Sequence, residues 1–169
     1  MYVTYLEIAY FQYNWFMPKP TPILFTQEGY NDLQHEYDTL TVKRPEYVLE
    51  LAKAAEMGDR SENAAYKYAK QKLRQTDSRL GYLKKMLDRA KVVTSTQKEY
   101  IEIGSQIVLH NGTRETTYRI VGGNESDPSN GLLSYQSPLG QALLKKKPGE
   151  EVEITTPAGK TRYKVVKII

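Results

Sequence analysis

Residues 30–54 read YNDLQHEYDTLTVKRPEYVLELAKA and residues 66–90 read YKYAKQKLRQTDSRLGYLKKMLDRA, and these two stretches decide the fold. In both stretches apolar residues recur at alternating spacings of three and four, which is typical of helices that pack along a seam. The first seam consists of Tyr30, Leu33, Tyr37, Leu40, Arg44, Tyr47, Leu51 and Ala54. The second consists of Tyr66, Ala69, Leu73, Thr76, Leu80, Leu83, Leu87 and Ala90. Each seam predicts one long helix with a single polar interruption.

The two seams are mirror images about residue 60. When one is read forward and the other backward, every pair of residue numbers adds to 120, and the polar Arg44 faces the polar Thr76. Large residues often face small ones, as good packing requires. This symmetry predicts an antiparallel hairpin whose arms of about 30 residues are each roughly 45 Å long. Thr26 is the expected N-cap of the first helix, and Pro45 should kink that helix or remove one hydrogen bond.

The predicted turn reads Met57-Gly58-Asp59-Arg60-Ser61-Glu62-Asn63. Gly58 can end the first helix in a left-handed conformation, and Asp59 or Ser61 can cap the second. The carboxylates of Asp59 and Glu62 can converge, and oxygen ligands suit Mg²⁺, although two carboxylates need further ligands from a partner. The alternative is that both acids only stabilise the start of the second helix.

The rest of the chain predicts a small β domain. Residues 101–110 and 113–121 form expected strands around Asn111-Gly112, a type I′ hairpin signal. A loop over 122–131, a strand over 132–136 and a helix from Ser137 to Leu144 should follow. Residues 151–156 and 160–169 form a last expected hairpin. The fold class is therefore α+β, with a coiled-coil hairpin over 18–95 and a mainly antiparallel β domain with one short helix over 96–169.

The amino-acid composition excludes several kinds of site and structure. The chain has no cysteine, which excludes disulfides and thiolate metal sites and favours a cytoplasmic location, and its two histidines form no ligand pattern. Residues 1–16 hold seven aromatic residues, lack a signal-peptide pattern, and are too short and polar to span a bilayer. We expect residues 1–17 to be an extension outside the functional domains. Met17 is the expected natural start, and residues 1–16 are either an upstream reading artefact or a dispensable arm.

Charge divides unevenly between the two predicted helices. Residues 26–56 hold seven acidic and three basic residues, whereas residues 62–91 hold three and nine. Antiparallel packing should place Lys72 near Glu50, and Arg79 near Lys43 in a like-charge contact that Asp77 relieves in part. An anionic partner such as RNA phosphate would relieve it further. The alternative is a solvated basic face. Tyr66 is expected in the seam and Tyr68 on the outside.

The sequence around the turn resembles the Gre transcript-cleavage factors, and it is more similar to GreB than to GreA. The resemblance covers residues 18–169. It rests on Arg44-Pro45-Glu46, on the stretch from Gly58 to Tyr66, and on Tyr68, Lys70, Lys72, Leu73, Arg74, Asp77, Arg79, Tyr82 and Leu83. In the C-terminal part it rests on Ser137-Pro138-Leu139, Ala142-Leu143-Leu144 and Thr156-Pro157-Ala158-Gly159.

The resemblance implies a function that the residues alone do not. In that family an FKBP-like β domain docks at the secondary channel of bacterial RNA polymerase, and the hairpin enters the channel. Asp59 and Glu62 are then the catalytic and metal-binding acids, sharing Mg²⁺ with the polymerase for cleavage of the extruded RNA 3′ end. Gly58, Ser61, Asn63 and Tyr66 would support the tip, and Lys70, Lys72, Arg74 and Arg79 would bind the RNA.

The same resemblance implies that the polymerase is the enzyme and that this protein is an accessory factor. It also implies that the protein is a monomer. Any association with DNA is expected only within the elongation complex, and no membrane is involved. Ala65 departs from the family pattern, which has an acidic residue before the tip tyrosine, and this leaves the cleavage strength open. Two alternatives stay open as well: a secondary-channel regulator that does not promote cleavage, and a structural coiled-coil adaptor.

Overall fold

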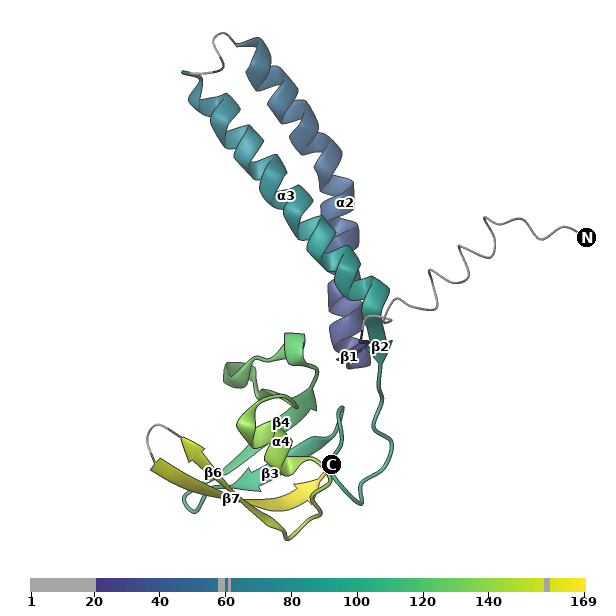
Figure 1. Ribbon diagram of the computed structural model, residues 1–169, viewed down its shortest axis with the longest axis vertical. Helices are drawn as coiled ribbons and strands as arrows, with labels where there is room; N and C mark the ends of the chain where they lie inside the picture. The colour runs from purple at the N-terminus through teal and green to yellow at the C-terminus, as the bar shows by residue number, and fades with distance from the viewer. Residues whose placement is uncertain (1–20, 58–59, 61, 157–158) are drawn as a thin grey trace, which may run out of the picture.

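The computed structural model describes residues 21–57, 60, 62–156 and 159–169, and it consists of a helical hairpin on a small β domain (Figure 1). Helix α2 spans Gln27–Glu56 and helix α3 spans Ala64–Arg89. The ends of α2 and α3 that meet at the turn lie farthest from the β domain (Figure 1). The predicted α+β class and the long antiparallel hairpin are confirmed. No helix in the described ranges is long and apolar enough to cross a membrane.

The two helices pack along the predicted seam. Ala54 of α2 and Ala69, Thr76 and Leu83 of α3 are buried there, and the other apolar seam residues are half-buried. The two polar seam residues, Thr76 and Arg44, bind different hydrogen-bond partners. The Thr76 hydroxyl donates to the Lys72 carbonyl oxygen at 2.9 Å, whereas Arg44 stays exposed and binds Asp77 with Nε and Oδ1 2.6 Å apart. Polar atoms at the seam therefore keep hydrogen-bond partners, as partly buried groups must.

The helix ends confirm one capping prediction and correct another. Thr26 caps α2, since its side chain accepts from Gly29 N at 3.1 Å. Helix α2 continues through Pro45. The cap of α3 is Asn63, so the prediction of Asp59 or Ser61 is wrong. The helix starts at Ala64, three residues after Ser61, and an N-cap must directly precede the first helical residue. The role predicted for Gly58 lies outside the described residues.

A short parallel pairing at the base of the hairpin was not predicted. Strand β1, Ile23–Phe25, pairs with β2, Ala90–Val92, directly after α3 ends. The pairing continues where Val93 N donates to Phe25 O at 2.8 Å. Phe25 is only 1% exposed. The chain entering the hairpin is thereby fixed beside the chain leaving it.

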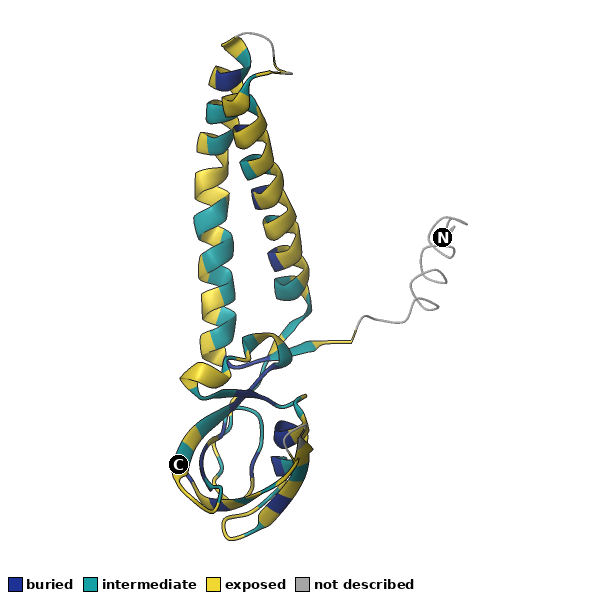
Figure 2. Cartoon of the chain, turned by 90° about the vertical axis from the view of Figure 1, so that its left-hand side faces the viewer, coloured by how far each residue is buried: buried dark blue, intermediate teal, exposed yellow. Residues whose placement is uncertain are grey.

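The β domain is a five-stranded sheet in the order β5-β4-β3-β7-β6. The strands are β3 Gln106–His110, β4 Glu115–Val121, β5 Leu132–Ser134, β6 Glu151–Thr156 and β7 Gly159–Ile168. Only the β4–β5 pairing is parallel within this sheet. The sheet curls around a core (Figure 2), which includes Ile107, Leu109, Ile120, Leu143 and Val165. The short helix α4, Pro138–Leu143, contributes Leu139 and Leu143 to this core, and its predicted N-cap Ser137 is confirmed.

The β domain differs from the prediction in its strand boundaries and loops, and strand β5 ends at Ser134 rather than at residue 136. Strand β3 begins at Gln106, because a turn with Gly104 at φ 97° precedes it. The β3–β4 loop has four residues, 111–114, with Asn111 N donating to Arg114 O, so the predicted two-residue turn is wrong. The predicted loop over 122–131 contains two short 3₁₀ helices, η1 at Gly123–Glu125 and η2 at Pro128–Asn130. A side-chain acceptor stabilises the 111–114 loop, since the Asn111 Oδ1 atom accepts hydrogen bonds from Thr113 N and Arg114 N.

Candidate nucleic-acid interface on the hairpin

Asn63 closes the end of the hairpin by bonding to both helices. Its Oδ1 atom accepts from Tyr66 N at 3.0 Å, which caps α3. Its Nδ2 atom donates to the carbonyl oxygen of Ala54, in the last turn of α2, at 2.8 Å. One side chain therefore satisfies an otherwise free amide of α3 and gives the Ala54 carbonyl oxygen, which also accepts from Met57 N at 3.3 Å, a second hydrogen bond. The bridge places Asn63 at the end of the hairpin, and its role in supporting the tip stays a prediction.

Glu62 lies immediately before this bridge and is exposed. Its predicted partner Asp59, and the tip residues Gly58 and Ser61, lie outside the described residues. Within the described part of the chain, no group of three or more His, Cys, Asp or Glu side chains could hold a metal ion. A Mg²⁺ part-site, in which the carboxylates of Asp59 and Glu62 supply oxygen ligands and a partner supplies the rest, stays a prediction.

Tyr66 occupies the first turn of α3 and is half-buried, as the seam prediction required. The Arg60 guanidinium and the Lys70 ammonium each lie 5.9 Å from the centroid of its ring. Cations at this distance are attracted by the negative face of the ring. Two cations therefore lie near the Tyr66 ring at the start of α3, and the role of Tyr66 in supporting the tip stays a prediction. Tyr68 is 68% exposed, as expected of a residue on the outside of the hairpin.

Two of the four predicted RNA-binding cations are engaged by α2. Lys72 Nζ lies 2.9 Å from Glu50 Oε2 and 4.0 Å from the centroid of the Tyr47 ring, so the predicted Lys72–Glu50 pair is confirmed. Arg79 donates two parallel hydrogen bonds to Glu36, both of 2.7 Å. The expected like-charge contact of Arg79 with Lys43 is therefore replaced by an ion pair. Glu36 lies seven residues, or two helical turns, before Lys43 on the same face of α2, so Arg79 contacts α2 two turns away from the predicted position.

These ion pairs shift the titration of their members. The hydrogen bonds from Arg79 lower the pKa of Glu36 below its ordinary value, against an opposing effect of burial. The hydrogen bond to Glu50 raises the pKa of Lys72, and the one to Asp77 raises the pKa of Arg44. All three cations remain charged at neutral pH. Carboxylates of α2 partly neutralise the charges of Lys72 and Arg79, which weakens the attraction of these two cations for a further anion.

The other two predicted cations, Lys70 and Arg74, line a groove of about 660 Å³ on the outer face of α3. The groove is lined by Lys67, Lys70, Gln71, Arg74, Gln75 and Ser78, and none of these residues is acidic. The prediction did not include Lys67. Its spacing of three and seven residues from Lys70 and Arg74 places it on the same helix face, and that spacing is the signal that could have identified it.

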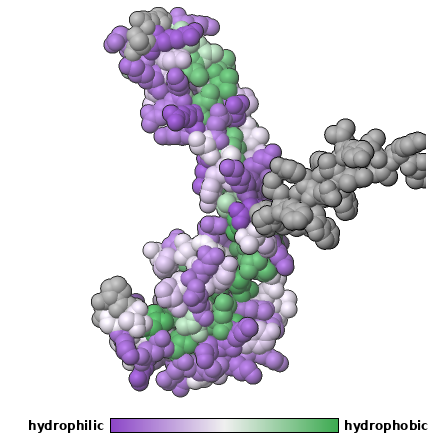
Figure 3. Space-filling model, viewed as in Figure 1, coloured by the Kyte–Doolittle hydropathy of each residue, from purple (hydrophilic) through white to green (hydrophobic). Residues whose placement is uncertain are grey.

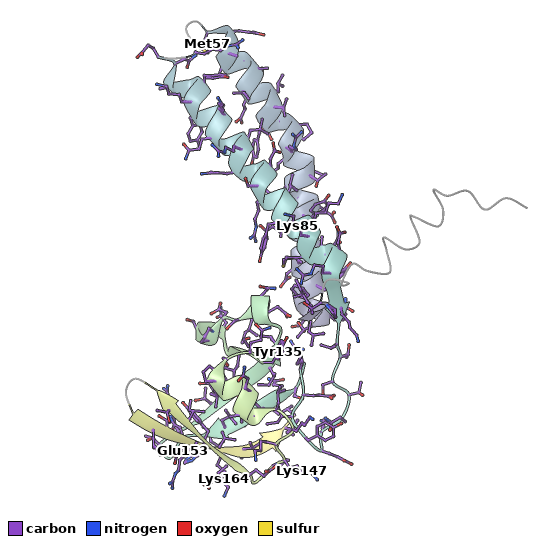
Figure 4. All side chains as sticks on the ribbon, in the orientation of Figure 1. Met57, Lys85, Tyr135, Lys147, Glu153 and Lys164 are labelled. Atoms are coloured by element: carbon purple, nitrogen blue, oxygen red, sulfur yellow. The ribbon has the colours of Figure 1, made fainter. Side chains whose placement is uncertain are left out.

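The outer surface of α2 is different from that of α3. Figure 3 shows hydrophilic residues over most of the visible hairpin and one apolar area toward its far end. Val42, Val48 and Leu49 of α2 are exposed by 78%, 41% and 54%. The end of the hairpin marked by Met57 lies at the opposite end of the molecule from Lys147, Glu153 and Lys164 of the β domain (Figure 4). The basic groove therefore lies on α3, whereas Val42, Val48 and Leu49, which are exposed aliphatic residues, lie on α2.

The fold and the site together define a class of protein in which a small β domain carries a long antiparallel coiled coil with an acidic, cation-flanked end. Two family models match the chain. Residues 23–92 match "Transcription elongation factor, N-terminal", and residues 96–169 match "Transcription elongation factor, GreA/GreB, C-term". The chain belongs to the GreA/GreB family of transcription elongation factors.

Relatives with this family name cover nearly the same length. Transcription elongation factor GreB of Xanthomonas axonopodis pv. citri is 44% identical over 150 residues, covering 86% of this chain and 89% of that protein. GreB of Pseudomonas putida is 42% identical, with 86% and 92% covered. GreA of Nitratiruptor sp. is 37% identical, with 85% and 90% covered. The crystal structure of GreA factor homolog 1 of Thermus thermophilus aligns at 25% identity and a TM-score of 0.41, covering 88% of this chain and 99% of that one.

Proposed function

We propose that this elongation factor stimulates the cleavage of backtracked nascent RNA by bacterial RNA polymerase, with its hairpin inserted in the secondary channel. The observation that carries the proposal is the exposed Glu62, held directly before the Asn63 bridge at the far end of the hairpin. An acid at the end of an arm of about 45 Å can reach a site that lies deep inside a partner. The polymerase is the enzyme, and this cytoplasmic factor completes its active site as a monomer.

The chemistry at the tip follows from the two acids. Asp59 and Glu62 would hold Mg²⁺ jointly with polymerase ligands, and the ion would supply Lewis-acid activation of the attacking water. Asn63, which bonds to both helices, directly follows Glu62, and we propose that this bridge limits the movement of the Glu62 carboxylate. Positioning of this kind accounts for a large part of catalytic rate, because reacting groups meet without a further loss of entropy.

The groove on α3 supports a contact with the extruded RNA 3′ segment. Lys67, Lys70 and Arg74 are among its lining residues, none of which is acidic, and single-stranded RNA presents a phosphate at each nucleotide. Lys72 and Arg79 face α2 carboxylates, and we propose that they stiffen the arm more than they bind RNA. The RNA contact therefore centres on Lys67, Lys70 and Arg74. A contact with DNA would arise only inside the elongation complex.

The direct experiment is an RNA-cleavage assay on an arrested elongation complex, with and without the protein. Acceleration of cleavage, with products ending at a new 3′ terminus in the active site, supports the proposal. Binding to the polymerase without any acceleration would favour a secondary-channel regulator that does not promote cleavage. Absence of binding would leave the coiled-coil adaptor as the better account.

A further inference from the structure

The N-terminus of α2 is bound by a carboxylate from the β domain. Glu125, the last residue of η1, accepts hydrogen bonds at Oε1 from Thr26 N at 2.9 Å and from Gly122 N at 3.2 Å. Its Oε2 atom accepts from the Thr26 hydroxyl. Thr26 is the N-cap of α2 and is only 5% exposed. One carboxylate thus joins a loop of the β domain to the residue from which the hairpin starts.

Two glycines allow this approach. A Cβ atom on Gly29, in the first turn of α2, would overlap the carboxylate of Glu125. A Cβ atom on Gly122 would overlap the backbone carbonyl oxygen of Leu24 in β1. The helix and the η1 loop therefore come into contact closer than any other residue type would permit. A negative charge at the N-terminus of a long helix is also favoured by the helix dipole.

Apolar packing does not fill the rest of this junction. A cavity of about 280 Å³ lies beside Glu125, bounded by Phe25 and Leu33 on the hairpin side and by Val121 and Leu132 on the β-domain side. An exposed ion pair, Glu28 with Arg119, crosses the same junction. Along the chain, residues 94–100 connect the two parts without helix or strand. Because neither a filled core nor a regular element fixes the angle here, polar contacts must contribute much of the restraint.

We infer that Glu125 is a positioning residue, whose carboxylate on Thr26 sets the direction in which the hairpin leaves the β domain. The consequence of this inference rests on the proposed function, because the direction of the hairpin determines where Glu62 lies inside the polymerase. With an arm of about 45 Å, a tilt of about 10° at the junction moves the tip by about 8 Å. A displacement of about 1 Å can already cost two orders of magnitude in rate when a catalytic group must be aligned.

The lack of cysteine permits a distance measurement in the full chain. Spin labels on the exposed positions of Lys53→Cys in α2 and Lys167→Cys in β7 report the orientation of the hairpin by double electron–electron resonance. The parent protein should give one narrow distance distribution. Glu125→Ala should broaden and shift it by several ångströms. Glu153→Ala is the matched control, because it removes a carboxylate that pairs with Lys160 and Arg162 within the β domain.

Gly29→Ala is a second, independent variant. Alanine has a higher helix propensity than glycine, while its methyl group displaces the Glu125 carboxylate. It should therefore broaden the distribution without unfolding α2, which circular dichroism would check. Narrow distributions at the parent distance in both Glu125→Ala and Gly29→Ala would overturn the inference.

A cleavage measurement on the same variants tests the consequence. Both variants should keep polymerase binding but lose at least tenfold in the stimulated cleavage rate, whereas Glu153→Ala should keep both. A broadened distribution with full cleavage would overturn the positioning role. If the parent protein itself failed to stimulate cleavage, the proposed function would fall, and the distances in the free protein would still decide whether Glu125 orients the hairpin.

Discussion

The Asn63 side chain connects α3 to α2, with Nδ2 2.8 Å from Ala54 O and Oδ1 3.0 Å from Tyr66 N. Asn63→Ala removes both bonds, and we expect a loss of about 1–2 kcal/mol in the free energy of unfolding. Urea denaturation measures it. Asn63→Asp is the matched control, because a carboxylate can still accept from Tyr66 N but cannot donate to Ala54. It should lose less than Asn63→Ala. Equal stability of Asn63→Ala and the parent protein would contradict the bridge.

Because its cations are exposed, the groove on α3 predicts that substitutions there reduce RNA contact without lowering thermal stability. Lys70→Ala with Arg74→Ala should reduce crosslinking to backtracked RNA several-fold and lower the salt dependence of that contact, because two phosphate contacts are lost. The thermal midpoint should stay near that of the parent protein, because both side chains are exposed.

Lys72→Ala is the comparison for the groove variants. It removes the ion pair with Glu50 and the contact with the Tyr47 ring, so it should lower the thermal midpoint and leave most of the RNA crosslink. The assignment of the RNA face would be wrong if Lys72→Ala lost the crosslink and the double variant kept it.

The Glu36–Arg79 ion pair predicts a pH dependence of stability. Because the pKa of Glu36 is lowered below 4.5 in the folded protein, the stabilisation is present above that value and is lost as pH falls through the folded pKa. Glu36→Gln should cost about 0.5 kcal/mol at neutral pH, a magnitude usual for half-exposed pairs. The difference from the parent protein should vanish in acid. Glu46→Gln, an exposed carboxylate on the same helix, is the control and should show little change with pH.

Ala65 offers a gain-of-stability test. Helix α3 has no acidic residue in its first turn, and Ala65 is exposed there. Ala65→Glu should raise the free energy of unfolding by about 0.5 kcal/mol through the helix dipole, and it should lower the Mg²⁺ concentration needed for half-maximal cleavage. Ala65→Gln has nearly the same size without the charge. A gain in Ala65→Gln equal to that in Ala65→Glu would exclude the electrostatic explanation.

The hairpin could be predicted in detail because its information is local. Each arm has eight seam residues at alternating spacings of three and four, so their burial and the antiparallel register follow from helix geometry alone. The pairing of Lys72 with Glu50 followed from the same register. The cap was less predictable. Asp59, Ser61 and Asn63 are all good N-caps, and the tertiary bond from Asn63 to Ala54 favours one of them.

Long-range contacts were the part that the sequence did not reveal. The β1–β2 pairing joins residues 23–25 to 90–92, and the Glu125–Thr26 contact joins positions 99 residues apart. The partner of Arg79 could not be predicted from spacing either. The side chains of Arg79 and Glu36 are long enough to reach each other, so Arg79 binds Glu36 rather than lying beside Lys43. Spacing rules cover neighbours along an element, and they do not rank partners that only the folded chain brings together.

The central claim is that the acids at the tip complete a cleavage site inside the polymerase. The measurement that tests it most directly compares the parent protein with the Asp59→Ala, Glu62→Ala double variant on arrested elongation complexes, recording polymerase affinity and RNA cleavage in the same samples. The account predicts unchanged affinity and a cleavage rate reduced to that of the polymerase alone. Full stimulation by the double variant would contradict it.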